Sequence, residues 1–316
     1  MLTSLPKITY FLSDKFNYNL MICSDAGPNY ASAYGWQTQS ISSLIDSNAS
    51  ICIIDNRIDP DEFQLLQGAL SRSDSLFLLK FVDSDFRCLE QPYVEFIFSI
   101  KPQSNLFFLS PYHPVELGEE LVQKHGSSHF INIPYAYDES REINIPLKNK
   151  KKRILLSGRI DPDGYPLRHR IHKETYRKLW SFFKVSYLKH SGYPDIGLPL
   201  MHNYINQKYI DLIAQHCFML VTPSRINYEL LKYSECAYGG SVPVGKKPSS
   251  FNHMPSNLFF EIDENDIHSS INKLFRIPYQ DLKLMANGYR QWMRDNRNPK
   301  YLNTLLFLQL EKLFNG

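Results

Sequence analysis

The chain has 316 residues, of which 43% are hydrophobic and 21% are charged, and its formal net charge is +3. This length exceeds what one compact core usually accommodates and predicts two domains. The small net charge argues against nucleic acid as the main ligand, because nucleic acid requires a concentrated basic face.

The cysteines and the apolar runs indicate in which cellular compartment the protein is found. No apolar run reaches the roughly 18–20 residues of a membrane span. The N-terminal stretch MLTSLPKITYFLSDKF is interrupted by charge and does not resemble a signal peptide. We therefore expect a cytoplasmic protein, and peripheral membrane contact stays open. The cysteines are odd in number and form no CxxC pair, which supports neither a disulfide framework nor a zinc site: Cys23, Cys52, Cys88, Cys217 and Cys236.

Short apolar runs bounded by turn residues recur in the first half of the chain. They predict buried strands of a parallel sheet at 19–24, 50–55, 75–82, 105–110 and 129–134. Segments with helical spacing lie between them, at 30–46, 60–71 and 114–125. Strand and helix alternating over about 25 residues is the βαβ pattern of an open α/β sheet. We expect this N-terminal domain to occupy residues 1–145.

A charged segment, YDESREINIPLKNKKKR (137–153), interrupts this pattern. It contains Pro146, and five of the residues 148–153 are basic. One interpretation is a patch for an anionic membrane or for nucleic acid. The other, which the usual behaviour of charge runs favours, is a solvated linker between domains. We expect the linker at 146–152.

The alternation then resumes and predicts a second α/β domain over 153–300. Strands are expected at 153–160, 183–188, 217–224, 241–245 and 257–262, and helices at 167–179, 204–215 and 227–238. A carboxylate in the region Asp263–Asp266 can cap a further helix. The tail over 279–316 has a helical pattern that is interrupted at Asn298-Pro299.

The stretch LLSGRIDPDGYPLRHR has the strand–glycine–helix form that can receive a phosphate. Helix N-termini present free N–H groups and a positive dipole end, and Gly158 and Gly164 supply loop flexibility. Arg159, Arg168 and Arg170 add guanidinium groups, which hold phosphate through a planar fork. A structural turn is the alternative. Neither GxGxxG nor GxxxxGK[ST] is present, so there is no dinucleotide fingerprint and no P-loop.

The second half resembles the C-terminal, nucleotide-binding domain of GT-B glycosyltransferases, in particular their group 1 and exostosin-like branches. Five stretches carry the resemblance in the family's order: FINIPYAYD, RILLSGRIDPDGYPLR, YIDLIAQHCFMLVTPSR, KYSECAYGGSVPVG and NLFFEIDENDIHSSINKLF. The resemblance implies an α/β protein of GT-B architecture, with two Rossmann-like domains facing a central cleft. It also implies that the last helix, 301–316, packs back on the N-terminal domain.

In KYSECAYGGSVPVG, Lys232 and Glu235 lie three residues apart and share one helical face. The resemblance implies that Glu235 binds the ribose of a donor nucleotide, because a carboxylate accepts two hydrogen bonds from a vicinal diol. Lys232 would neutralise the diphosphate of the leaving group. A surface charge is the alternative for Glu235, and Gly239-Gly240 are expected to let the backbone pass close to the ligand. The preferred phosphate ligands are Arg168 and Lys232, and the alternates are Arg159, Arg170 and Arg225.

The sequence departs from the family at one position. Retaining members often have two glutamates eight residues apart, but the residue eight positions before Glu235 is Asn227. Glu229 is six positions before Glu235, which places it about 240° away around a helix. The stereochemical outcome therefore stays open: Asn227 or Tyr228 contacts the sugar, or Glu229 does so from a loop.

An inverting enzyme needs a general base beside the acceptor hydroxyl. Loops at the carboxyl ends of strands face the cleft in open α/β sheets, which points to the loops of the N-terminal domain. The preferred candidates are Asp25 and His113, followed by Asp55, Asp83 and Asp85. Each carboxylate is alternatively a turn or a helix cap. Three aromatic residues stack on an acceptor sugar or form a packed cluster: Tyr30, Tyr34 and Trp36.

The acidic and histidine motifs give no support to a metal site. The two DPD tripeptides, at 59–61 and 161–163, have a central proline and are interpreted as turns. We expect metal-independent transfer from a nucleotide-diphosphate sugar to a carbohydrate or glycan acceptor, without a further cofactor and without nucleic acid as a partner. The alternatives are a non-catalytic nucleotide- or carbohydrate-binding protein, a sugar-nucleotide epimerase or a dinucleotide oxidoreductase.

Overall fold

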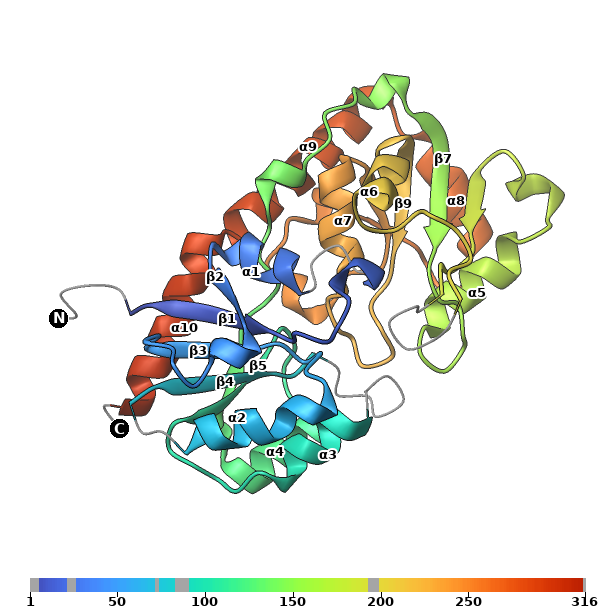
Figure 1. Ribbon diagram of the computed structural model, residues 1–316. Helices are drawn as coiled ribbons and strands as arrows, with labels where there is room; N and C mark the ends of the chain where they lie inside the picture. Colours follow the sequence, from blue (N-terminus) through green and yellow to red (C-terminus); the bar gives the residue numbers. More distant parts are fainter. Residues whose placement is uncertain (1–5, 22–26, 72–73, 83–90, 193–198, 315–316) are drawn as a thin grey trace. The chain divides into compact units, whose positions relative to one another are not determined.

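The computed structural model describes residues 6–21, 27–71, 74–82, 91–192 and 199–314. The chain divides into two compact units (Figure 1). The N-terminal unit comprises Met1–Asn19, Asp25–Ala136 and Pro299–Gly316, and the C-terminal unit comprises Leu20–Ser24 and Tyr137–Asn298.

Within the described residues, the N-terminal unit is built on a parallel sheet of six strands in the order β2-β1-β3-β4-β5-β6. The strands are β1 Ile8–Leu12, β2 Gln37–Ser40, β3 Ile51–Ile54, β4 Leu76–Lys80, β5 Leu106–Ser110 and β6 Phe130–Asn132. The helices include α1 Pro28–Tyr34, α2 Phe63–Leu70, α3 Gln91–Ser99 and α4 Leu117–His125. The inner strands β3, β4 and β5 are almost entirely buried, which is why they read as continuous apolar runs.

Four of the five strands predicted in the first half are confirmed, as β3, β4, β5 and β6. The strand predicted at 19–24 is wrong, because Tyr18–Leu20 form a 3₁₀ helix and residues 22–24 lie outside the described residues. The first strand is β1 instead. Its Tyr10 is buried and donates a hydrogen bond to Asp55, a distant contact that satisfies the hydroxyl and that no local pattern reveals.

The helix predicted at 30–46 is wrong beyond Tyr34. Gly35 ends α1 in the left-handed conformation, with φ +73°, and its N–H donates to Ser32 O at 3.0 Å. Glycine is the usual residue at such a helix end. The chain then forms β2, which pairs in parallel with β1 at the edge of the sheet. Its polar sequence QTQS suits an edge strand whose side chains are exposed or half-buried.

The C-terminal unit has a parallel sheet of five strands within the described residues, in the order β11-β10-β9-β7-β8. The strands are β7 Lys151–Ser157, β8 Val185–Leu188, β9 His216–Val221, β10 Val242–Gly245 and β11 Phe260–Glu261. The helices include α5 Pro166–Thr175, α6 Asn206–Ala214, α7 Lys232–Gly239, α8 Ile267–Arg276 and α9 Tyr279–Asn296. Each strand overlaps its predicted range, and Asp266 caps α8 by accepting from Ser269 N. Two parallel α/β units confirm the predicted fold class.

Helix α7 is shorter than the helix predicted at 227–238, because the chain before it is turned. Asn227 has φ +61°, and its N–H donates to Ser224 O at 3.0 Å. A residue in this conformation does not continue a right-handed helix. Lys232 is therefore the first residue of α7.

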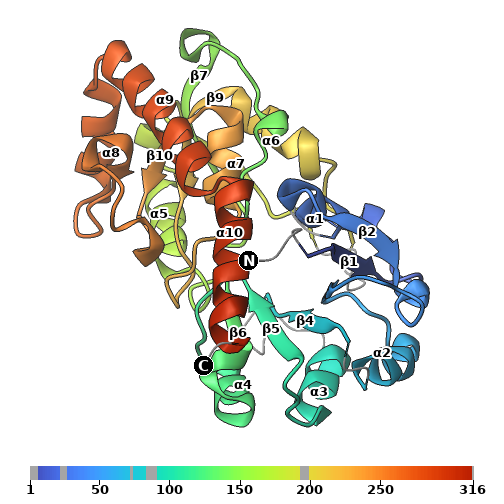
Figure 2. The ribbon, with the colours of Figure 1, turned by 90° about the vertical axis from the view of Figure 1, so that its left-hand side faces the viewer.

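The tail forms two helices, α9 and α10 (Pro299–Phe314), and the predicted interruption lies between them. Helix α10 belongs to the N-terminal unit, where Asn303 accepts a hydrogen bond from Trp36 Nε1 at 2.8 Å. Gln309 donates to a backbone carbonyl of β6 at 3.2 Å, and Figure 2 shows α10 in red beside this strand. In the described part of the chain, no helix combines the length and the apolar character needed to cross a bilayer.

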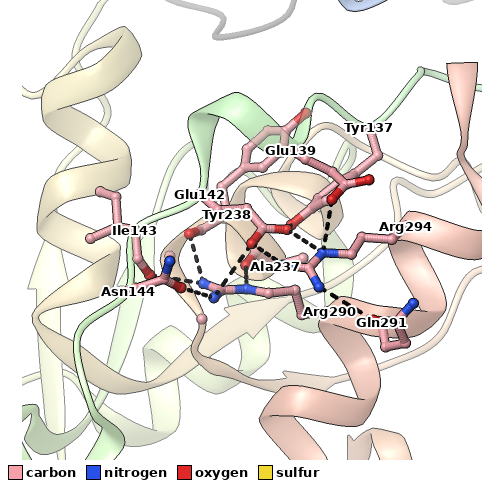
Figure 3. Close-up of polar contacts among 12 residues, drawn as sticks. Tyr137, Glu139, Glu142, Ile143, Asn144, Ala237, Tyr238, Arg290, Gln291 and Arg294 are labelled. Carbon is pink, nitrogen blue, oxygen red and sulfur yellow. Dashed lines mark hydrogen bonds and ion pairs between the residues drawn. The ribbon is translucent and has the colours of Figure 1, made fainter.

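The charged segment 137–153 is bound to the C-terminal unit at its start (Figure 3). Glu142 accepts a hydrogen bond from Arg294 Nε at 2.8 Å and lies 3.7 Å from Arg290 Nη1. Arg290 also donates to the backbone carbonyls of Ile143 and Tyr238, at 2.9 and 3.0 Å. These contacts fix the segment across the C-terminal end of α7.

The end of the same segment is also bound. Lys150 is only 7% exposed, and its Nζ donates to Gly239 O at 2.5 Å and to Gly240 O at 2.7 Å. The interpretation as a solvated linker is wrong for this lysine, because the end of α7 leaves carbonyls that need donors. Lys148, Lys151 and Lys152 are exposed.

Gly239 and Gly240 permit close packing between helices. A Cβ on Gly239 would lie 2.5 Å from Ile213 Cγ2, and one on Gly240 would lie 2.4 Å from Arg290 Nη2. Both glycines precede β10 and so lie at the amino-end edge of the sheet. Ligands of open α/β sheets bind at the carboxyl ends of the strands. Their position at the other edge therefore does not favour the expected passage of a ligand beside these glycines.

Candidate functional site

Two cationic side chains meet over Gly158, at the carboxyl-end edge of the C-terminal sheet. Gly158 follows the last residue of β7 and has φ +89°. A Cβ at this position would lie 2.8 Å from Lys232 Cε and 3.2 Å from Arg168 Nη1. The structure thus brings together Gly158 and Arg168 of one predicted phosphate motif and Lys232 of another.

Lys232 is held in place by two hydroxyl groups. Its Nζ donates to Tyr209 Oη at 2.6 Å and to Ser157 Oγ at 3.1 Å. Tyr209 lies on α6 and Ser157 ends β7, so three elements of the unit fix the ammonium group. Burial, followed by the nearness of Glu235, raises the pKa of Tyr209, and the phenol stays neutral.

Arg168 is the second cation and is only 2% exposed. It lies on the first turn of α5, and its Nη1 donates to Arg159 O at 2.9 Å. Its guanidinium group also lies 4.3 Å over the ring of Tyr165. The side chain of Arg159 is half-exposed and pairs with Asp161 at 2.9 Å. The glycine loop therefore presents one buried and one exposed arginine.

His190 lies close to the cations of this edge. It follows β8, and burial together with nearby Lys232, Arg159 and Arg168 lowers its pKa from 6.5 to about 4. The imidazole is therefore neutral at pH 7, and several cations lie near it. A cluster of this kind attracts an anion.

Glu235 lies one turn after Lys232 and is 5% exposed. The alternative interpretation as a helix-surface charge is therefore wrong. After burial, the charge of Glu235 is the next cause that raises the pKa of Tyr209, the phenol that holds Lys232.

The loop after β9 reaches the same edge of the sheet. Arg225 N donates to Gly164 O at 2.9 Å, which joins this loop to the glycine loop. The side chains of Arg225 and Asn227 are exposed, whereas Tyr228 is buried. Arg170 pairs with Glu264 at 3.2 Å.

Glu229 does not replace the missing glutamate of the family pattern. Both of its oxygens accept hydrogen bonds from Arg297, at 3.0 and 2.6 Å, and Ser250 Oγ donates to one of them at 2.7 Å. Glu229 and Arg297 are 9% and 6% exposed. The hypothesis that Glu229 contacts the sugar from a loop is wrong, because this carboxylate is engaged in a buried ion pair.

The candidates for the catalytic base in the N-terminal unit differ in whether the structure describes them and in how exposed they are. Asp25, Asp83 and Asp85 lie outside the described residues. His113 is exposed on the loop that follows β5. Asp55 is fully buried: it accepts from Tyr10, and Lys80 Nζ lies 3.5 Å from it. Asp55 is therefore a poor candidate for a base that must reach an acceptor.

The aromatic residues proposed for an acceptor sugar form a packed cluster. Tyr34 and Trp36 are stacked with ring centroids 4.2 Å apart, and Tyr30 lies 5.0 Å from Tyr34. All three are at most 8% exposed. They fill the core of the N-terminal unit, so the alternative of a packed cluster is confirmed.

Both DPD tripeptides are turns, as predicted. Asp59 caps the 3₁₀ helix Pro60–Glu62 by accepting from Asp61 N, and Asp161 accepts from Gly164 N at 2.6 Å. Over the described ranges, no group of three or more His, Cys, Asp or Glu side chains is placed to hold a metal ion. Metal independence stays a prediction.

The sequence analysis missed three residues at this edge: Ser157, Tyr209 and His190. Ser157 and Tyr209 meet across 52 residues, a contact that depends on how α6 packs on β7. His190 had a usable signal, because it lies just after a predicted strand, where ligands of parallel sheets bind.

Comparisons with known proteins identify the fold. No protein-family model and no curated protein matches the sequence. An alpha-glucosyltransferase in complex with UDP and a 13-mer DNA matches with a TM-score of 0.61, over 95% of this chain and 97% of its own, at 11% identity. HepE from Anabaena, in complex with UDP and glucose, matches with a TM-score of 0.55, over 98% and 100%, at 10% identity.

A third structure, the DNA-modifying beta-glucosyltransferase, matches with a TM-score of 0.59, over 98% of this chain and 100% of its own, at 10% identity. The resemblance to the group 1 and exostosin-like branches stays a prediction, because identities this low show the fold alone. Together, the two parallel α/β units and these neighbours show that the chain has the GT-B fold of glycosyltransferases.

Proposed function

We propose that the protein is a glycosyltransferase that moves a sugar from a nucleoside-diphosphate sugar to a hydroxyl group of a carbohydrate or glycan. The observation that carries the proposal is the meeting of Lys232 and Arg168 over Gly158. Two cations beside a strand–glycine–helix turn suit a diphosphate. The UDP bound by neighbours of the same fold supports this choice of ligand.

Lys232 and Arg168 stabilise the departing nucleoside diphosphate in this proposal. When the bond between the sugar and the phosphate oxygen breaks, both electrons stay on that oxygen, and its negative charge grows. Hydrogen bonds already fix the two cations, so little reorientation is needed as the charge develops. Because the protein supplies this positive charge, we propose a metal-independent reaction.

The remaining donor contacts are assigned by position. Glu235 takes the ribose hydroxyls, because it is buried one turn from Lys232. Arg159 and Arg225 lie on the two joined loops and take outer phosphate oxygens. Asn227, rather than the buried Tyr228, contacts the sugar, because its side chain is exposed at this edge. No cofactor beyond the donor is proposed.

The two candidates for the residue that activates the acceptor are His113 and Asp25. We propose one of them as the base that removes the proton of the acceptor hydroxyl. His113 is exposed after a strand end, which is a suitable place for this role. A carbohydrate acceptor is preferred to nucleic acid, because the net charge is only +3.

Calorimetric titration with UDP, GDP and their sugar conjugates tests the donor site. Arg168→Ala and Lys232→Ala should each weaken nucleotide binding about tenfold or more. Arg170→Ala is the matched control, because Arg170 lies on the same helix but pairs with Glu264. The proposal fails if no nucleoside diphosphate binds, or if Arg168→Ala and Arg170→Ala have equal effects.

Turnover separates the enzyme from its alternatives. Release of UDP or GDP from a sugar nucleotide is measured with oligosaccharides, glycan fragments and duplex DNA as acceptors. Release that depends on a glycan supports the proposal. Binding without release under all conditions supports a non-catalytic binding protein. Conversion of the sugar without nucleotide release supports an epimerase.

A further inference from the structure

Three apolar side chains project into solvent from the loop between α5 and β8. Leu179 is 94% exposed, Phe183 79% and Phe182 68%. We call these residues the apolar tip. A group of large apolar side chains in water marks a contact surface.

The backbone of this loop is fixed from several sides. Ser181 is buried, and its hydroxyl oxygen lies within hydrogen-bond distance of the carbonyl oxygens of Thr175 and Lys178. Arg153 of β7 donates to Phe182 O at 2.6 Å and to Val185 O at 2.7 Å. Trp180 packs against the core of the C-terminal unit. The apolar tip is therefore presented by an ordered backbone, which reduces the entropy lost on docking.

Basic residues flank the apolar tip in the sequence. In residues 173–184, four basic side chains accompany a single acidic one. β7 and β8 are parallel neighbours, with Ile154 paired to Val185, so the start of β7 lies at the same sheet edge as the tip. The exposed lysines of the charged segment lie at or just before that start: Lys148, Lys151 and Lys152.

A hollow of about 520 Å³ opens beside the apolar tip. The residues that line it include His172, Tyr176, Tyr187, Arg153 and Arg177. Aromatic rings with polar ends, next to cations, match the headgroup layer of a membrane, where one side of a ring is apolar and the other is wet.

We propose that this surface docks on an anionic lipid bilayer. Leu179, Phe182 and Phe183 enter the boundary of the acyl chains, and the basic residues bind the headgroup phosphates. Leu179, the most exposed of the three, neither stacks on nor hydrogen-bonds a base, so an acyl chain suits this side chain better than nucleic acid. A second copy of the same surface would bring like charges together across an isologous interface.

The proposed donor site is far enough away to stay open during docking. Gly158 follows the opposite end of β7, which is seven residues long. A strand of this length spans roughly 20 Å. Docking would therefore hold the protein at a membrane and leave the proposed nucleotide site open. The docking proposal does not depend on the proposed reaction.

Vesicle co-sedimentation of the full chain tests the proposal. Vesicles with equal amounts of phosphatidylglycerol and phosphatidylcholine should bind the protein about tenfold more strongly than vesicles of phosphatidylcholine alone. The combined substitution Leu179→Ser, Phe182→Ser and Phe183→Ser should weaken this binding about tenfold or more. Lys151→Ala with Lys152→Ala should weaken it too, and about 0.5 M NaCl should lower the binding of the wild-type protein.

Leu284→Ser with Leu308→Ser is the matched control, because these leucines are 70% and 47% exposed on other helices. Thermal melting confirms that each variant is folded. The proposal is overturned if the wild-type protein does not bind anionic vesicles, or if the tip variant binds as well as the control. Self-association or duplex-DNA binding that the substitutions abolish, without vesicle binding, also overturns it.

Discussion

Lys232 and Tyr209, 23 residues apart in the sequence, are joined by a hydrogen bond of 2.6 Å from the ammonium group to the phenol oxygen. The ammonium nitrogen also lies 4.7 Å from the centre of the tyrosine ring. Burial raises the pKa of this phenol, so it stays protonated and its neutral oxygen serves as the acceptor. The side chain that we propose for the diphosphate is thus oriented by a residue that carries no charge.

Tyr209→Phe tests this orientation. The substitution keeps the ring but removes one acceptor from Lys232, so we expect nucleotide affinity to fall about fivefold, in line with about 1 kcal/mol for one hydrogen bond. Calorimetry measures the change. Tyr289→Phe is the control, because Tyr289 Oη donates to Tyr233 O in the core. If both variants keep wild-type affinity, Tyr209 does not position Lys232.

Gly158→Ala should damage both stability and binding. The backbone has φ +89°, and the new Cβ would lie 2.8 Å from Lys232 Cε. We expect a loss of about 1–2 kcal/mol in the free energy of unfolding, together with weaker nucleotide binding. Urea unfolding and calorimetry measure the two effects.

Gly68→Ala is the control for this substitution. Gly68 lies within α2, and a Cβ added there would have no neighbouring atom within 4 Å outside its own helix backbone. Alanine favours a helix over glycine by about 1 kcal/mol, so stability should stay the same or rise. Wild-type stability and affinity in Gly158→Ala would show that the loop tolerates a side chain.

The sequence predicted the residues that lie next to strong local patterns. Gly158 follows a predicted strand, Arg168 starts a predicted helix, and Lys232 lies in another. Parallel topology alone brings such positions to one sheet edge. Tyr209 and Ser157 were missed, because their contact depends on the packing of two elements 52 residues apart.

Buried polar groups of the N-terminal unit have distant partners that the sequence does not show. Tyr10 lies in β1, a strand that the sequence analysis did not predict, and its hydroxyl donates to Asp55, 45 residues away. Lys80 lies in a run that was read as apolar. It is 2% exposed, 3.5 Å from Asp55 and 4.0 Å from the ring centre of Tyr30. Tertiary partners of this kind leave no periodic signal in the sequence.

Glu229→Ala distinguishes a structural carboxylate from a sugar contact. The substitution leaves the buried Arg297 without its bidentate partner, and we expect the free energy of unfolding to fall by about 3–5 kcal/mol. The nucleotide affinity of the folded fraction should not change. Glu229→Met combined with Arg297→Met should recover much of the loss, because no unpaired charge remains buried. Intact stability with lost turnover would instead place Glu229 in the site.

His190 should contribute to the pH dependence of the free energy of unfolding. Burial, followed by Lys232 and Arg159, lowers its pKa from 6.5 to about 4. Between these two pH values the imidazole binds a proton in the unfolded chain but not in the folded chain. The free energy of unfolding therefore falls as the pH falls. His190→Gln should make the decline between pH 6.5 and 4 shallower, as measured by urea unfolding at each pH.

A bound diphosphate should reverse part of this pKa shift. It places negative charge among the cations that face His190, so the pKa of His190 should rise by about one unit when UDP is added. NMR titration of the imidazole protons measures this change. His125 is the internal control, because burial and Lys124 lower its pKa to about 4 in the N-terminal unit. If UDP binds and His190 moves no more than His125, the diphosphate does not lie beside Lys232 and Arg168.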